Sequence, residues 1–358
     1  MAAAASETHP EFYDKQDRNL HPFLFVGCWN LQDEPRNAVV ATMTQMAAAK
    51  GIQNIVLGGD NVYPTKETDD AIDKWKETKE GPKPKKHNIG VFREGIEMFT
   101  PPYFVTLALG NHNIENGNVL EAEMAYLPVK NSYYLQEFDD AVLVVFDANI
   151  TRKDDEKDEK EKKKDFRYSK MLNWLDTCLS YLMTVGKPYY FVTHEPFGSF
   201  KKGGMTIWGI LKETMKNLVK GGEKGENARV AIESGETPQV LSKLQTLPPV
   251  SVLCADTHHY EDGIIRGGEN QIRQVIVGSG GASPDDYTNG IPHFSLGGPF
   301  IYEMTSAPIK SYGFLSIPEE GVLDFVPVVE WTPKAGGSRR RTRKRRAHKK
   351  MTRRNVRR

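Results

Sequence analysis

Short runs of hydrophobic residues recur along the chain between turn-forming residues. Continuous hydrophobicity over roughly four to eight positions, without alternation, predicts strands that are buried on both faces. The strands predicted in this way cover residues 23–27, 54–59, 103–110, 141–147, 189–194, 250–255, 273–278 and 322–331.

Two segments between these runs show the periodicity of helices instead. Residues 35–50 place Val39, Met43 and Met46 on one face, and residues 166–183 carry an apolar stripe that includes Leu175. Strands that alternate with helices are typical of an α/β domain with stacked layers. The pattern therefore predicts the α/β class.

Polar residues that bind metals follow several of the predicted strands. Asp60, Asn111, His194, Asp256 and His258 each stand just after a hydrophobic run. Ligands of open α/β sheets bind beyond the carboxyl ends of the strands, where such residues converge. Carboxylate, amide and imidazole groups together suit a hard-to-borderline divalent cation. We therefore expect a metal site at this rim.

The net charge hides two parts of opposite sign. The 358 residues contain 48 Lys and Arg against 47 Asp and Glu, for a formal net charge of +1. Residues 339–358 hold 13 of the basic residues and no acidic one, which leaves 48 − 13 = 35 basic against 47 acidic residues elsewhere. The chain is thus a body of charge −12 followed by a tail of charge +13, and the two need separate interpretation.

The basic segment at 335–358 predicts a disordered tail, because it has too few apolar residues to fold alone. Dense arginine without acidic residues favours DNA or RNA binding, with an affinity that falls as salt rises. The alternatives are a purely targeting role and docking onto an acidic body. The predicted nucleic-acid-binding residues are Arg339, Arg340, Arg341, Arg343, Lys344, Arg345 and Arg346.

Hydropathy and cysteine content indicate where in the cell the protein is expected. No run of about 18 apolar residues suggests a membrane span, and the first residues lack the pattern of a secretory signal. The three cysteines are far apart, which favours free thiols in a reducing compartment. We expect an intracellular protein that is not secreted, with a nuclear or virion-associated location as the narrower hypothesis. Its oligomeric state stays open.

Composition shifts suggest the domain organisation. We expect an N-terminal extension at 1–20, one domain at 21–334 and the basic tail at 335–358. A charged insertion at 151–165 interrupts the domain and is interpreted as a solvated loop or a helix extension. Residues 80–88 are interpreted as a surface insertion.

Five short motifs occur in order at the predicted strand ends. They are GCWN (27–30), GDNVY (59–63), GNHN (110–113), VTHEP (192–196) and ADTHH (255–259). Together they resemble the calcineurin-like metallophosphoesterases, closest in pattern to the purple acid phosphatase (tartrate-resistant) branch. The resemblance implies a four-layer α/β/β/α sandwich with two divalent or trivalent ions of iron, zinc or manganese. It also implies phosphoester hydrolysis by attack of a metal-bound hydroxide.

The resemblance assigns roles to particular residues. Asp60 would bridge the two ions. The second ion would be bound by Asn111 and His194, and the first by Tyr63 and His258. His112 would protonate the leaving alkoxide or orient the phosphate.

Four positions depart from the family pattern. Cys28 stands where the family has its first aspartate, Asp256 replaces a histidine, and Asn30 and Asn113 replace other polar residues. Asp256 is an acceptable ligand and completes the second position. Cys28 is either a thiolate ligand that favours zinc or iron, or a small buried thiol. If it is the latter, only one ion is expected to bind.

Two functions therefore remain open at this point. The first is an active metal-dependent phosphatase or phosphodiesterase acting on a monoester, a diester or a phosphoprotein. The second is a degenerate member of the family that serves as a nucleic-acid-binding or virion structural protein. The complete second position and His112 favour the first, and the altered first position at Cys28 favours the second.

Overall fold

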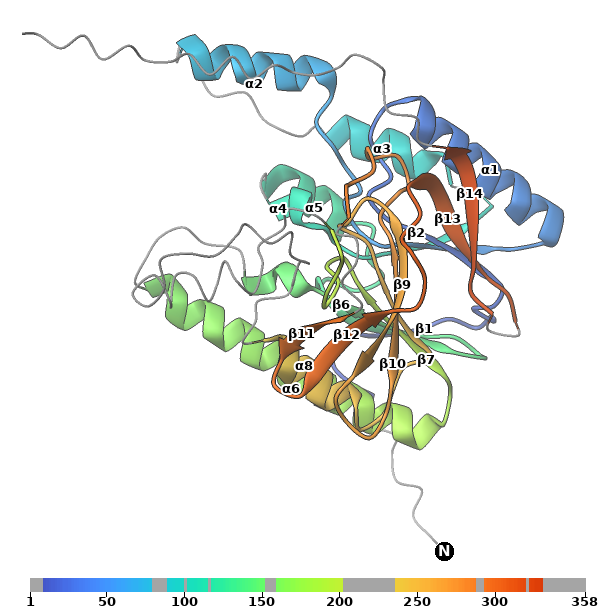
Figure 1. Ribbon diagram of the computed structural model, residues 1–358, viewed down its shortest axis with the longest axis vertical. Coiled ribbons are helices and arrows are strands. Elements are labelled where there is room, and N and C mark those ends of the chain that lie inside the picture. The colour runs from blue at the N-terminus through green and yellow to red at the C-terminus, as the bar shows by residue number, and fades with distance from the viewer. Residues whose placement is uncertain are drawn as a thin grey trace, which may run out of the picture.

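The computed structural model describes residues 9–78, 89–99, 102–114, 117–151, 159–201, 236–287, 293–319 and 322–330. Two β-sheets form the centre of this part of the chain (Figure 1). The predicted nucleic-acid-binding tail and the insertion at 80–88 lie outside the described residues.

The larger sheet has nine strands in the order β1-β5-β6-β7-β8-β10-β9-β12-β11. Neighbours from β6 to β10 run parallel, and the strands at either end pair mostly antiparallel. The bounds are β1 Tyr13–Lys15, β5 Tyr134–Glu137, β6 Val142–Phe146, β7 Tyr189–Thr193, β8 Ser251–Cys254, β9 Tyr260–Arg266, β10 Ile272–Val277, β11 His293–Gly297 and β12 Phe300–Met304.

The smaller sheet has five strands in the order β14-β13-β2-β3-β4. Its strands β2, β3 and β4 are parallel, so their carboxyl ends meet at one edge. The bounds are β2 Phe23–Val26, β3 Asn54–Leu57, β4 Phe104–Leu107, β13 Ser311–Ile317 and β14 Asp324–Glu330.

Helices cover the outer faces of both sheets. In Figure 1, α6 and α8 lie along the larger sheet, and α1 and α3 lie on the side of the smaller sheet. The helix bounds are α1 Glu34–Lys50, α2 Lys66–Thr78, α3 Ile89–Glu97, α4 Asn111–Ile114, α5 Gly117–Met124, the 3-10 helix η1 Ala148–Thr151, α6 Glu159–Val185 and α8 Thr237–Leu244. The order helix, sheet, sheet, helix confirms the predicted four-layer sandwich.

Local chemistry determines where α1 begins and ends. The Asp33 side chain accepts a hydrogen bond from the Arg36 backbone N–H, and Pro35 occupies the first turn. Gly51 closes the helix in the left-handed conformation (φ 68°) and donates its N–H to the Ala47 carbonyl. These caps determine both ends of α1.

Two hydrophobic cores hold the layers together. One lies between the sheets and extends to α1, and it contains Phe25, Leu143 and Leu253. The other packs α6 and α8 against the outer face of the larger sheet, with Val144 and Phe191 among its members. Leu143 and its neighbour Val144 therefore face opposite cores, which is why their strand has no polar alternation.

Each predicted strand and helix is present in the structure. The sequence analysis missed β1, β5, β9, β11, β12 and β13, together with the short helices. Polar residues or glycine interrupt the hydrophobic runs of these strands, even in β13, whose seven residues are all buried. The charged insertion belongs to α6 from Glu159 onward, which supports the helix-extension interpretation over that part. No helix among the described residues is long and apolar enough to cross a membrane.

The position of Leu253 between the sheets leads to a stability prediction. Leu253 is completely buried, so Leu253→Ala is expected to lower the free energy of unfolding by about 2–5 kcal/mol through lost burial and a cavity. Met183 is 59% exposed, and Met183→Ala is expected to change the free energy of unfolding by less than about 0.5 kcal/mol. Denaturant titration measures both values, and equal effects would contradict the assigned core.

Candidate metal centre

The predicted metal-binding residues come from five strand ends. Cys28, Asp60 and Asn111 follow β2, β3 and β4 of the smaller sheet, while His194 and Asp256 follow β7 and β8 of the larger sheet. Each of these strands belongs to a parallel set, so the residues reach the same rim from both sheets. The structure brings the two groups together there.

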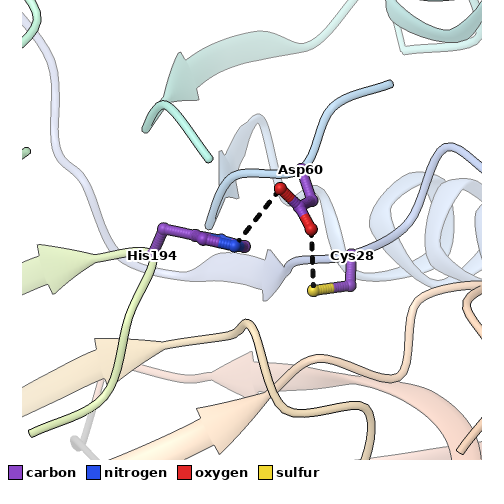
Figure 2. Close-up of side chains that lie close together, drawn as sticks. All are labelled: Cys28, Asp60 and His194. Carbon is purple, nitrogen blue, oxygen red and sulfur yellow. Dashed lines mark hydrogen bonds and ion pairs between the residues drawn. The ribbon is translucent and has the colours of Figure 1, made fainter. Parts of the chain in front are cut away.

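Asp60 lies at the centre of the cluster and is 2% exposed. Figure 2 shows its two carboxylate oxygens facing different partners, with Oδ2 at 3.9 Å from Cys28 Sγ and Oδ1 at 3.3 Å from His194 Nε2. Tyr63 donates its hydroxyl to Oδ2 at 2.9 Å, and the His112 backbone N–H donates to Oδ1 at 3.2 Å. One carboxylate thus joins two sets of donors.

The first set surrounds Asp60 Oδ2. Cys28 Sγ and the Tyr63 hydroxyl both face this oxygen, and the Tyr63 hydroxyl in turn lies 3.3 Å from His258 Nε2. Cys28 is fully buried and packs against Tyr63 in a small cluster with Ala255 and Ala282. Tyr63 and His258 are the residues that the family resemblance assigns to the first ion, and Cys28 stands at the position of the family's first aspartate.

The second set surrounds Asp60 Oδ1. His194 Nε2 is 3.3 Å from this oxygen and 3.9 Å from Asp256 Oδ1. Gly110 touches Asp60 so closely that a β-carbon would meet the Asp60 nitrogen at 2.1 Å, which brings the next residue, Asn111, to the cluster. The Asn111 Oδ1 atom is buried without a hydrogen-bond partner among the described residues.

Hydrogen bonds from the outer nitrogens orient both histidines. His194 Nδ1 lies 2.8 Å from the Gly58 carbonyl, and His258 Nδ1 lies 3.1 Å from the Ser283 carbonyl. Each carbonyl selects the tautomer whose free Nε2 points into the cluster, as is usual for histidines that bind metals. Nε2 of the buried His194 makes no hydrogen bond in the described part of the chain. The donor set therefore fits metal ions.

Backbone strain is concentrated in the same place. Cys28, Asp60 and Asp256 have φ values of 49°, 52° and 55°, in the left-handed region that side chains with a β-carbon rarely adopt. This conformation costs roughly 1–2 kcal/mol per residue. Strain of this kind persists where the surroundings enforce it and is common at functional sites.

Burial and charge shift the pKa values of these groups strongly. Burial alone would raise the pKa of Asp60, but His194 and His112 lower it far below its usual range. Burial opposes the charged form of His194, whereas Asp60 raises its pKa to about 9. Burial, followed by Asp60, raises the pKa values of the Cys28 thiol and the Tyr63 phenol. A bound cation would stabilise the ionised forms of Asp60, Cys28 and Tyr63 and so offset the cost of burying their charges.

His112 lies at the open side of the cluster. Its side chain is 23% exposed, its Nε2 lies 3.7 Å from Asp60 Oδ2, and its ring stands 4.7 Å from the Tyr63 ring. Because the side chain is partly exposed, the imidazole is accessible to a molecule that enters from solvent.

The sequence analysis missed a buried hydrogen-bond network beneath the site. Asn61 accepts a hydrogen bond from Trp29 Nε1 at 3.0 Å and donates to the Ala108 carbonyl at 2.9 Å, which ties together the loops after three strands. Asn30 donates to the Asn61 carbonyl at 2.8 Å and accepts from Arg36 at 3.0 Å. The only sequence signal was the position of Asn61 directly after Asp60.

A second missed feature supports His258. Asp285 accepts a hydrogen bond from the His258 backbone N–H at 2.9 Å and forms an ion pair with Lys201 at 2.7 Å. Burial and the nearby Lys201 charge lower the pKa of His258, while Asp285 opposes them. Nothing in the local sequence links residues 201, 258 and 285.

The Asn61 network predicts a stability effect that is specific to the site. Asn61→Ala leaves the Trp29 N–H and the Ala108 carbonyl unpaired in a buried place, so the free energy of unfolding is expected to fall by about 1–3 kcal/mol. Asn173→Ala, on the exposed face of α6, serves as the matched control and is expected to be nearly neutral. Equal stability of both variants in thermal unfolding would contradict the role of Asn61.

Comparisons with known proteins give structural matches only. No protein-family profile matches the chain. The search of curated proteins likewise finds no match. Among solved structures, the chain is similar to GAP50, the anchor in the inner membrane complex of Plasmodium (14% identity, 86% of this chain and 84% of that one, TM-score 0.49). It is also similar to a dimetal phosphatase from Danio rerio (12%, 87% and 97%, TM-score 0.48).

A third solved structure is a purple acid phosphatase from yellow lupin (Lupinus luteus) seeds. The match has 12% identity and a TM-score of 0.52, and it covers 87% of this chain but 52% of the lupin chain. The present chain thus spans about half of that enzyme. At this identity the similarity establishes the fold, and it agrees with the order of motifs along the sequence. The protein has the fold of the calcineurin-like metallophosphoesterases, the family that includes the purple acid phosphatases.

Proposed function

We propose that the protein is a metal-dependent phosphoester hydrolase whose reaction takes place at the Asp60 cluster. The observation that supports this most strongly is the position of Asp60 between two donor sets, one on each carboxylate oxygen. A structural carboxylate needs only one ion pair. A carboxylate shared by two sets of buried donors is typical of a bridging ligand in a two-metal site.

The residues present divide into two shells around Asp60. Cys28, Tyr63 and His258 would hold one ion, and Asn111, His194 and Asp256 would hold the other. When bound, the ions supply Lewis-acid activation of water and neutralise charge on the phosphoryl oxygens. Iron, zinc and manganese all suit donors of these kinds.

The chain's own groups then supply position and proton transfer. His112 Nε2 faces the cluster at 3.7 Å from Asp60 Oδ2 and is reached from solvent, so it would protonate the leaving oxygen of the phosphoester. The ion pair of Lys201 with Asp285 holds the backbone of His258 in place. The Asn61 network keeps the three loops of the smaller sheet from moving apart.

Substitutions at the cluster test the proposed activity. His112→Ala is expected to lower kcat for an aryl phosphomonoester or diester by about 10²–10⁴-fold, because a general acid is lost. Asp60→Asn is expected to lower kcat at least as far and to reduce metal content, since the carboxylate charge between the two donor sets is removed. The control is Asp176→Asn, which breaks an exposed ion pair on α6 and should leave activity unchanged.

Two results would contradict the proposal. One is purified protein that binds no metal ion. The other is full turnover by Asp60→Asn, which would mean that a contaminating enzyme causes the measured activity. A folded protein with bound ions and no turnover of either ester class would favour the degenerate family member with a binding role.

A second candidate function concerns the basic tail. The 13 basic and no acidic residues at 339–358 are the observation that favours it. We propose that this segment binds DNA or RNA through phosphate contacts and so holds the catalytic body near a polyanion. The domain boundary at 334/335 belongs to the same proposal.

Deletion of residues 338–358 tests the tail. The truncated protein is expected to lose salt-sensitive retention on duplex DNA or RNA. Its phosphoesterase activity is expected to be unchanged, because none of the residues of the Asp60 cluster belongs to the deleted segment. A control variant replaces the tail with a glycine-serine segment of equal length. Equal retention of the full-length and truncated proteins across a salt series would reject the role in binding.

A further inference from the structure

The two donor sets at Asp60 differ in chemical softness, and Cys28 is the source of the difference. On the Oδ1 side, His194 faces the oxygen, Asp256 lies 3.9 Å from the same imidazole, and the buried Asn111 Oδ1 lacks a hydrogen-bond partner among the described residues. The set around Oδ2 contains a sulfur atom in addition to oxygen and nitrogen donors. Thiolate ligands select thiophilic ions such as Zn²⁺, whereas carboxylate and carbonyl oxygens also suit Mn²⁺.

Three separations among the donors near Oδ2 are close to those around a tetrahedral ion. Zinc bonds of about 2.0 Å to N or O and 2.3 Å to S place tetrahedral donors roughly 3.3–3.5 Å apart. The structure has 2.9 Å between Tyr63 OH and Asp60 Oδ2, 3.3 Å between Tyr63 OH and His258 Nε2, and 3.9 Å between Cys28 Sγ and Asp60 Oδ2. These three separations lie on either side of the values required for a tetrahedral ion.

Cys28 differs in its setting from the other two cysteines. Its Sγ, together with an oxygen of Asp60 and a nitrogen of His194, forms a group of possible metal ligands whose atoms all lie within 4.8 Å of one another. Cys254 and Cys178 are buried in the outer hydrophobic core. Cys28 also shares the left-handed backbone of the two carboxylates Asp60 and Asp256. It therefore has the same backbone conformation as two residues that carry charged oxygen donors.

We propose that Cys28 Sγ is a metal ligand and that the two positions are inequivalent, with Zn²⁺ preferred at Cys28, Asp60, Tyr63 and His258. The position at Asn111, His194 and Asp256 then accepts harder ions such as Mn²⁺. On binding, the Cys28 S–H bond breaks, its proton passes to the buffer, and a sulfur–metal bond forms without a change in oxidation state. The inference rests on the proposed metal-dependent function and adds to it the selectivity of each position.

Access to the first position does not require unfolding. The side chains of His258 and His112 are 22% and 23% exposed, so one side of the cluster opens to solvent. The imidazole of His258 is partly exposed on that side, whereas the sulfur of Cys28 is buried. Exchange by chelation in the folded protein is therefore expected.

Cobalt substitution tests the sulfur ligand without reference to turnover. The full chain is stripped with a chelator and titrated with Co²⁺, and the near-ultraviolet sulfur-to-cobalt charge-transfer band is recorded with metal stoichiometry. The wild type is expected to show the band, and Zn²⁺ is expected to remove it by competition more readily than Mn²⁺. Cys28→Ser is expected to lose the band. Its Zn²⁺ affinity is expected to fall by at least about 100-fold, since even residues that only hydrogen-bond to metal ligands contribute about 10–100-fold.

Two further variants separate ligation from folding. Cys254→Ser changes another buried thiol and is expected to keep the band, and circular dichroism confirms that each variant is folded. Cys28→Asp supplies a carboxylate in the same turn and is expected to keep two bound ions without the band, with a weaker preference for Zn²⁺ over Mn²⁺.

The outcomes distinguish this inference from the function on which it rests. Two bound ions without a charge-transfer band, or a band that persists in Cys28→Ser, would overturn the sulfur ligand while leaving the proposed hydrolase intact. Absence of any bound ion in the wild type would overturn both. A band that is lost in Cys28→Ser and in Cys28→Asp, but retained in Cys254→Ser, supports the inference.

Discussion

The burial of the Asp60 carboxylate is the constraint on which the arrangement of the site depends. A charge at 2% exposure is costly unless it is paired and hydrogen-bonded. Here His194 faces one oxygen, Tyr63 donates to the other, and the His112 backbone adds a third contact. Partners from both sheets thus converge on one group. Removing any of them leaves a buried charge less well compensated, so the cluster is expected to act as a unit.

The sheets can supply these partners only if their loops approach very closely. A β-carbon at Gly59 would meet the His194 ring at 2.5 Å, and Gly59 also has a φ of 94°. A β-carbon at Gly110 would meet the Asp60 backbone. Glycine is the residue that satisfies both requirements. The glycines in the motifs are therefore needed for the distance between the sheets as well as for the turns themselves.

The same geometry allows a cysteine at position 28 without a change of fold. A thiol is small and apolar enough to pack against Ala255 and Ala282, so the loop after β2 keeps its path. Its sulfur nevertheless faces the oxygen of Asp60 that Tyr63 also reaches. Replacing a carboxylate by a thiol at such a position alters which ions the site prefers while the carboxyl ends of the strands remain where they are.

The amino-acid pattern was enough to predict the class of fold, the eight strands with continuous hydrophobic runs, both long helices and the residues at the rim. It did so because doubly buried strands are continuous hydrophobic runs and because metal-binding side chains must follow them. It did not reveal six further strands or the support from Asn61, Asp285 and Lys201. Polar residues or glycine interrupt the hydrophobic signal of those strands, and supporting contacts join residues far apart in the chain. Which oxygen of Asp60 faces Cys28 and which faces His194 was decided by the packing of the two sheets, since sequence order carries no information about that distance.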